Sequence, residues 1–301
     1  MNGSTSYEII LGYLPEALRR LMPKWSDCGM SGLNEIRLHA NGPVCFVYYD
    51  KTMFLSGSGA MASSYNKDSY ILAPCGIAEC VDRLSHYSLH SCGKQLAEGF
   101  FVVENGIRIG AAGAYSNCSP YSLTEITSLN FRIPRSAVGC ADKLFSSVYC
   151  RNAMICGSVG SGKTTILRDI CRLMGNIMKV SLIDERNEIA CVYKCAPQYD
   201  VGVMTDIISG LDRASGIWSA VRTLSPDVII CDEIASFRDT EAVIDSVSCG
   251  VRTILTAHGT SIDEISRRKG ICELIEQKAV DIIIFLSGAS SPGKVREIVR
   301  L

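Results

Sequence analysis

The sequence has no apolar run long enough to cross a bilayer. A membrane-spanning helix needs about 20 consecutive apolar residues, and no stretch of these 301 residues approaches that length. The first residues also lack a basic segment ahead of an apolar core and instead carry the acidic Glu8 and Glu16. No secretory signal is therefore expected, and the sequence predicts a protein that stays in the cytoplasm.

An excess of basic charge is also missing. The chain carries 30 Lys and Arg against 31 Asp and Glu, for a net charge of −1. Its longest basic run is Arg267–Lys269, which is typical of a solvated helix face. Proteins that hold nucleic acid over an extended surface are usually strongly basic, so that class is disfavoured.

Zinc-type spacing is absent although the chain has 15 cysteines. No C-x-x-C pair occurs, the closest pair is Cys191 and Cys195, and the four histidines have no zinc-like spacing to the cysteines. Several cysteines lie within apolar stretches, as do Cys156, Cys171, Cys231 and Cys272. We expect them to act as small hydrophobic residues in a reducing compartment.

One short stretch carries the most diagnostic pattern of the chain. Residues 157–164 read G-S-V-G-S-G-K-T, which fits the phosphate-binding loop G-x-x-x-x-G-K-[ST]. Glycines let such a loop curl so that successive N–H groups face phosphate oxygens. An apolar run at 153–156 precedes it and a helical pattern at 165–174 follows. The expected ATP contacts are Gly157, Ser158, Val159, Gly160, Ser161, Gly162, Lys163, Thr164 and Thr165.

Two carboxylates follow a second apolar strand at 228–231. Asp232 is expected to hold Mg²⁺ together with Thr164, and Glu233 is placed to polarise an attacking water. An acidic loop without a catalytic role is the alternative, although it is improbable downstream of a phosphate-binding loop. The added Glu233 favours hydrolysis over simple phosphate transfer.

Further candidates are weaker. Glu185 follows the strand at 179–183, and ligands gather at the carboxyl ends of parallel strands; a solvated loop is an equal alternative for it and for Asp184. His258 ends another strand and is a candidate γ-phosphate sensor. Charge stabilisation during phosphoryl transfer also calls for arginine, and the candidates are Arg222, Arg132 and Arg108.

Two other classes of phosphate-loop protein do not fit. Residues 208–212 stand where an ABC transporter ATPase carries L-S-G-G-Q, but they lack the second glycine and the glutamine. The short interval between Lys163 and Asp232 also leaves no room for the inserted helical subdomain of that class. A GTPase would carry N-K-x-D, and this sequence has none.

The pattern of elements predicts two domains. Residues 1–133 are expected to form a small α+β domain with antiparallel pairing, including a hairpin closed by Asn105 and Gly106. Residues 134–139 are expected to be a linker. Residues 140–301 alternate strands and helices, which predicts an α/β, RecA-like core with a mainly parallel sheet. Its expected strands are 153–156, 179–183, 228–231, 253–256 and 282–286.

Several stretches resemble a known family. The acidic strand end between the two nucleotide motifs, Arg222 before Asp232 and Glu233, and His258 after them resemble the Asp box, an arginine and the His box of type II/IV secretion ATPases. The whole chain resembles the stage III sporulation ATPases of endospore-forming bacteria. The matching stretches are 11–18 (LGYLPEAL), 34–38 (NEIRL), 87–88 before Gly99, 106–113 (GIRIGAAG), 128–135 (SLNFRIPR), 139–142, 183–189 (IDERNEI) and 225–234 (SPDVIICDEI).

The resemblance implies an ATPase on the mother-cell side of the engulfing membrane that uses ATP and Mg²⁺. It would energise a secretion-like channel between mother cell and forespore, as a hexameric ring beside membrane-anchored partners. Arg132 stands where an arginine of such rings can reach the nucleotide. Asp232 stands where secretion ATPases often carry glycine, which leaves the roles of Asp232, Glu233 and Glu185 open. A nucleic-acid-dependent ATPase and an ATP-binding assembly scaffold are the alternatives.

Overall fold

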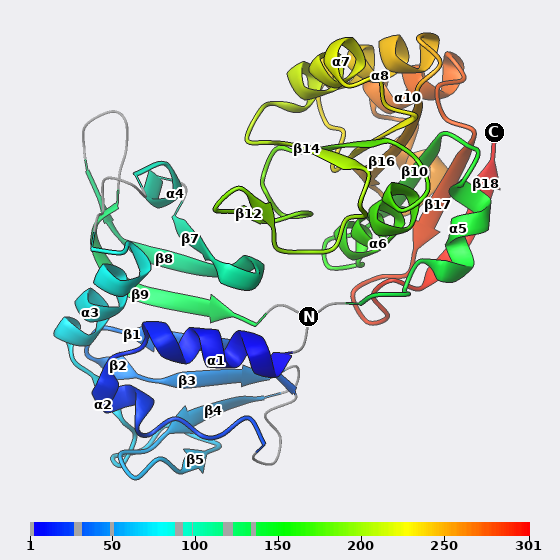
Figure 1. Cartoon of the computed structure of the whole chain (residues 1–301). Helices are drawn as coiled ribbons and strands as arrows, with labels where there is room; N and C mark the ends of the chain where they lie inside the picture. Colours follow the sequence, from blue (N-terminus) through cyan, green and yellow to red (C-terminus); the bar gives the residue numbers. More distant parts are fainter. Residues whose placement is uncertain are drawn as a thin grey trace. The chain divides into compact units, whose positions relative to one another are not determined.

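The computed structural model describes residues 3–26, 32–48, 51–87, 93–97, 99–116, 123–133 and 137–301. The chain divides into two compact units, Met1–Ser136 and Ala137–Leu301 (Figure 1). Three of the residues expected to form the linker, 134–136, lie outside the described part. Each unit has its own sheet and its own hydrophobic core.

The N-terminal unit is built on a seven-stranded antiparallel sheet. Its strand order is β5-β4-β3-β1-β9-β8-β7, and β2 pairs separately with β6. The strands are β1 (Leu33–His39), β2 (Gly42–Pro43), β3 (Cys45–Tyr48), β4 (Thr52–Leu55), β5 (Met61–Ala62), β6 (Ile71–Leu72), β7 (Phe100–Val103), β8 (Ile107–Tyr115) and β9 (Leu123–Arg132). The β7–β8 turn has positive φ at Asn105 (58°) and Gly106 (62°), the backbone that the Asn-Gly pair predicts.

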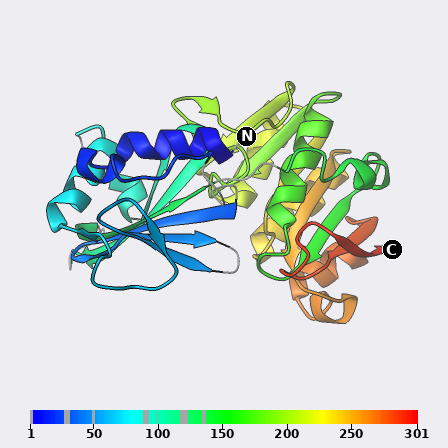
Figure 2. The ribbon, with the colours of Figure 1, turned by 90° about the horizontal axis from the view of Figure 1, so that it is seen from below.

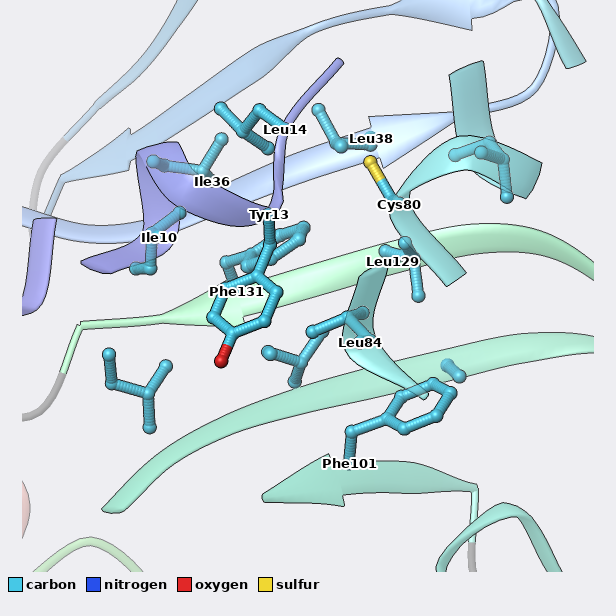
Figure 3. Close-up of a cluster of buried hydrophobic side chains, with 14 of the residues drawn as sticks. Ile10, Tyr13, Leu14, Ile36, Leu38, Cys80, Leu84, Phe101, Leu129 and Phe131 are labelled. Carbon is cyan, nitrogen blue, oxygen red and sulfur yellow. The ribbon is translucent and has the colours of Figure 1, made fainter. Parts of the chain in front are cut away.

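Helices pack on one face of this sheet. The sequence at 7–22 predicts one helix or two helices broken near Pro15, and the structure has two, α1 (Gly3–Tyr13) and α2 (Glu16–Arg19), on either side of that proline. Two further helices are α3 (Pro74–Leu84) and α4 (Gly93–Ala97). Figures 1 and 2 show α1 lying over the sheet. Its Ile10 joins Leu84 of α3, Ile36 of β1 and Phe131 of β9 in a buried cluster (Figure 3).

The C-terminal unit has a sheet of the order β14-β11-β15-β16-β10-β17-β18. Neighbouring strands are parallel except for the last pair, β17 and β18. The strands are β10 (Ala153–Gly157), β11 (Val180–Asp184), β14 (Thr205–Ser209), β15 (Val228–Cys231), β16 (Arg252–His258), β17 (Ile282–Leu286) and β18 (Val295–Arg300). A small ribbon, β12 (Val192–Tyr193) with β13 (Ala196–Pro197), lies between β11 and β14 in sequence.

Helices cover both faces of this sheet. Because successive strand residues point to opposite sides, each strand contributes side chains to two cores. On β10, Ala153 and Ile155 join the core formed with α5 and α6, whereas Met154 and Cys156 join the core formed with α7, α8 and α10. The helices are α5 (Asp142–Val148), α6 (Lys163–Gly175), α7 (Arg213–Thr223), α8 (Phe237–Ser248), α9 (Ile262–Ile265) and α10 (Lys269–Glu276). Because β14, β11, β15, β16, β10 and β17 run parallel, their carboxyl ends meet at one edge of the sheet.

The buried cysteines of this unit serve packing, as their apolar context predicts. Cys156 and Cys171 are fully buried in its cores. Burial raises the pKa of each thiol to about 12, so neither is a thiolate at neutral pH. Cys272 is half-exposed. Among the described residues, no helix is both long and apolar enough to span a bilayer.

A buried carboxylate fastens the start of the C-terminal unit to α6. Asp169 is only 4% exposed. It accepts hydrogen bonds from Gly139 N (3.2 Å), Ala141 N (2.8 Å) and Arg172 Nε (2.8 Å). Burial alone would raise the pKa of Asp169, but these hydrogen bonds and the Arg172 charge outweigh it and hold the pKa below its usual value.

This pKa predicts a pH-dependent contribution to stability. Because the folded pKa of Asp169 lies below the unfolded value of about 3.9, its contribution is present above that value and is lost as the pH falls through the folded pKa. At pH 7, Asp169→Asn should lower the free energy of unfolding by about 1.5–3 kcal/mol, the range for hydrogen bonds to a charged group. Urea unfolding at pH 7 and pH 3 should show the two proteins converging at the lower pH. Parallel pH profiles would contradict this role.

Candidate active site

The carboxyl edge of the parallel sheet contains a pocket of about 420 Å³. Its lining comes from the loop and helix after β10, from the segments that follow β11 and β15, from the end of β16 and from the turn after β17. The lining residues are Val159, Gly160, Ser161, Gly162, Lys163, Thr164, Thr165, Glu188, Asp232, Glu233, His258 and Pro292. The structure thus gathers most of the predicted nucleotide-site residues around this pocket, which we name the phosphate pocket after the predicted loop that lines it.

The glycines of the 157–164 loop are needed for its path. Gly160 and Gly162 have φ of +74° and +92°, a backbone region that residues with a Cβ rarely adopt. A Cβ on Gly162 would also lie 2.6 Å from the backbone nitrogen of Gly293. That nitrogen donates a hydrogen bond to Ser161 O at 2.8 Å. The turn between β17 and β18 therefore packs against the 157–164 loop and is hydrogen-bonded to it.

Lys163 lies across this loop. Its ammonium Nζ donates to Gly157 O and Ser158 O, each at 2.9 Å. Burial lowers the pKa of Lys163, while the nearby carboxylates of Asp232 and Glu233 oppose the shift. The two carbonyl contacts hold the Lys163 ammonium against the loop, where a phosphate-binding loop needs a cation for the β- and γ-phosphates.

Thr164 and Asp232 form a paired oxygen site. Thr164 Oγ1 donates to Asp232 Oδ2 at 3.0 Å, and the other oxygen of Asp232 accepts a hydrogen bond from the Thr256 hydroxyl. Hydroxyl and carboxylate oxygens are the ligands that Mg²⁺ takes beside a nucleotide. These residues, with the glycine loop and Lys163, fit a magnesium nucleotide.

Glu233 is held in an unusual backbone conformation. Its φ is +55°, a left-handed value that costs free energy for a residue with a Cβ and clusters at functional sites. Its N–H donates to Thr256 Oγ1 at 2.8 Å, which fixes the backbone there. The carboxylate then lies between two basic groups: Oε1 is 3.2 Å from His258 Nε2, and Oε2 is 3.2 Å from Arg186 Nη1.

Asp184 and Glu185 do not line the phosphate pocket. Asp184 is buried and accepts backbone N–H bonds from Glu188 (2.8 Å), Ile189 (3.0 Å) and Ala190 (2.9 Å). It therefore shapes the loop after β11 and places Glu188 at the pocket. Glu185 pairs through Oε2 with Arg213 Nη1 at 2.6 Å in a separate hollow.

Arg213 connects Glu185 to the carboxyl end of β15. Its guanidinium Nε donates to Asp232 O at 2.7 Å, and its side chain is only 14% exposed. The geometry gives Glu185 an indirect contact with the site through Arg213, in place of the direct catalytic position expected from the sequence.

Arg222, the predicted arginine of the C-terminal unit, does not line the phosphate pocket. Arg222 lines a hollow with Trp218 and Asp245 on α7 and α8, which shares no lining residue with the phosphate pocket. Arg132 and Arg108 belong to the N-terminal unit. There Arg132 pairs with Glu35 at 3.8 Å, and Arg108 stacks on the ring of Phe100 at 3.8 Å.

Arg186, Glu188 and Pro292 are the site residues that the sequence argument missed. Arg186 and Glu188 stand two and four positions beyond Asp184, within the matching stretch 183–189. Both residues are therefore part of a recognisable sequence pattern, but Glu185 lies nearer to the strand end and is the residue that the strand-end rule predicts. Pro292 lies in a turn of small residues that carries no chemical pattern.

The fold and the pocket define a class of proteins. Two solved structures with similar folds are the ATPase DotB of Legionella pneumophila and the pilus retraction motor PilT with bound ADP. DotB has a TM-score of 0.55 and 16% identity over 84% of this chain and 71% of its own. PilT has a TM-score of 0.57 and 16% identity over 84% and 74%. The chain therefore has the α/β fold of P-loop secretion and pilus ATPases, as predicted.

A family and a relative narrow this class. The family model described as sporulation stage III, protein AA matches residues 5–300. Stage III sporulation protein AA of Bacillus subtilis (strain 168) is 31% identical over 296 residues, covering 95% of this chain and 92% of its own length. The chain belongs to the sporulation stage III, protein AA family, which confirms the predicted resemblance.

Proposed function

We propose that this protein is an ATP-hydrolysing motor that energises a channel between mother cell and forespore during endospore formation. The observation that carries the proposal is the convergence of Lys163, Thr164, Asp232 and Glu233 on one pocket. Family membership supports the sporulation setting, and the fold shared with secretion and pilus ATPases supports the motor.

The residues suggest how hydrolysis would proceed. Lys163 and the loop N–H groups hold the β- and γ-phosphates of ATP. Thr164 and Asp232 would hold Mg²⁺, which supplies positive charge to the phosphate oxygens. Glu233 orients a water so that its oxygen bonds to the γ-phosphorus while the bond to the β–γ bridging oxygen breaks. The products are ADP and inorganic phosphate, and the proton that the water loses passes to Glu233 and then to solvent.

The assembly is proposed on the same basis. Residues 140–301 would be the motor domain, and residues 1–133 would couple it to membrane-anchored channel proteins from the cytoplasm of the mother cell. Secretion ATPases suggest a homohexameric ring. In such a ring, Arg132 would complete a nucleotide site from the N-terminal domain.

The test is phosphate release by the purified full chain. We expect ATP turnover that requires Mg²⁺ and is lost in Lys163→Ala, because the cation that holds the phosphates is removed. Lys143→Ala, an exposed lysine on α5, is the matched control and should turn over normally. Turnover that needs single-stranded DNA and falls steeply with salt would instead indicate a nucleic-acid-dependent ATPase. Absence of turnover under every condition would contradict the proposal.

A further inference from the structure

An arginine outside the sequence-predicted set contacts the proposed catalytic glutamate. Arg186 lies in the loop after β11, and its Nη1 is 3.2 Å from Glu233 Oε2. The Arg186 side chain is 60% exposed and that of Glu233 is 28% exposed. Exposed ion pairs contribute little to stability, typically about 0–1 kcal/mol. The pair is therefore easily broken, and a stronger anion can compete for Arg186.

The charges around the pocket show why a γ-phosphate bound beside Glu233 would need a contact with Arg186. Among the described residues that line the pocket, Glu188, Asp232 and Glu233 carry carboxylates and Lys163 carries an ammonium group. Lys163 faces the loop carbonyls, and Asp232 pairs with Thr164. Even with Lys163 and a bound Mg²⁺ on the phosphates, the negative charge of Glu233 would repel a γ-phosphate beside it, and a further cation next to Glu233 would offset that repulsion.

Arg186 has the chemistry to bridge the two anions. A guanidinium carries five N–H donors in a planar fork, so one pairing with Glu233 leaves donors for phosphate oxygens. Arginine also binds phosphate by parallel hydrogen bonds that lysine cannot reproduce. The loop that carries Arg186 is fixed next to the site by Asp184, which accepts N–H bonds from residues 188–190. Glu233 is fixed by Thr256.

We propose that Arg186 is the γ-phosphate contact of this ATPase, supplied by the same unit as the phosphate-binding loop. It pairs with Glu233 in the structure and turns its guanidinium to the terminal phosphate when a nucleoside triphosphate binds. Glu233 is then released from one of its two basic neighbours and becomes available to orient water. This inference rests on the proposed hydrolysis for its purpose, but its binding consequences do not require turnover.

Competition for Arg186 predicts a specific pattern of affinities. A ligand without a γ-phosphate gains nothing from Arg186, so ADP affinity should not depend on it. A triphosphate must draw Arg186 away from Glu233, so removing the Glu233 charge should tighten triphosphate binding. The two effects are coupled through one guanidinium and should therefore be non-additive.

The experiment measures equilibrium binding of ADP and of an ATP analogue with a β,γ-imido bridge to the full chain at fixed salt. Arg186→Ala should weaken binding of the analogue by roughly 10-fold or more, as loss of a charge-assisted hydrogen bond implies. Its ADP affinity should stay within about twofold. Glu233→Gln should tighten analogue binding relative to ADP, and the double variant should lose that gain. Arg186→Lys should rescue analogue binding only partly.

Arg300→Ala provides the matched control, because Arg300 is an exposed arginine on β18, and it should leave both affinities unchanged. Equal losses for the analogue and ADP in Arg186→Ala, or no loss for either, would overturn the inference. Additive effects in the double variant would overturn it as well. Failure of wild-type turnover would instead count against the proposed function alone, since none of these affinities depends on hydrolysis.

Discussion

Glu233→Gln should bind magnesium ATP at least as tightly as the wild type and hydrolyse it about 10²–10⁴-fold more slowly, the range for loss of a general base. Glutamine keeps the shape of the side chain and its place between Arg186 and His258, but it cannot accept a proton from water. Phosphate release under saturating ATP, together with equilibrium nucleotide binding, measures the two halves of this prediction.

Glu241→Gln is the matched control for this loss. Glu241 is an exposed acid on α8, so its variant should keep wild-type turnover. If Glu233→Gln turns over ATP within about threefold of the wild-type rate, Glu233 is not the general base. Weak nucleotide binding in that variant would assign Glu233 to the binding site.

Asp184→Ala should lower the free energy of unfolding by about 3 kcal/mol or more, because three backbone N–H groups, two of them buried, lose their acceptor and each such loss costs about 1–3 kcal/mol. For a unit of this size, the melting temperature should fall by roughly 6–12 °C. Thermal unfolding followed by circular dichroism checks the shift. Turnover should fall as well, since Asp184 fixes the loop that carries Arg186 and Glu188.

Asp206→Ala separates this structural role from a general effect of acid removal. Asp206 lies exposed on the edge strand β14, paired in register with Ser181 of β11. Its loss should change stability by less than about 0.5 kcal/mol. Equal stability of Asp184→Ala and Asp206→Ala would contradict the loop-shaping role of Asp184.

Local patterns were sufficient to predict the α/β ATPase fold and several residues that line the candidate site. The phosphate-binding loop is recognisable because glycines are required where φ is positive, at Gly160 and Gly162. The strand at 228–231 is recognisable because it is buried on both faces. Asp232 and Glu233 come directly after it, so their position follows from the strand alone.

The loop after β11 could not be predicted in the same way. Its path depends on three backbone bonds to Asp184 and on a positive φ of 53° at Asn187, and neither leaves a periodic pattern. The loop therefore turns Glu185 towards Arg213 and brings Arg186 to Glu233. Closeness to the strand end therefore predicts Glu185 at the pocket, whereas Arg186 is the residue that contacts Glu233.

The arginine on α7 was misplaced for a topological reason. Arg222 is close to Asp232 in sequence, but it lies in the last turn of α7, before the amino end of β15. The phosphate pocket lies at the carboxyl end of that strand. Proximity in sequence across a parallel strand therefore places a residue at the opposite edge of the sheet.

The most direct test of the motor proposal is the fate of a single ATP in the pocket. The full chain, in excess over ATP and with Mg²⁺, is quenched at increasing times, and the nucleotides are separated. Wild-type protein should convert the bound ATP completely to ADP and inorganic phosphate, while Glu233→Gln should still hold ATP at the same times. ATP that stays bound and intact in the wild type would contradict the motor and favour a protein that binds ATP only to assemble.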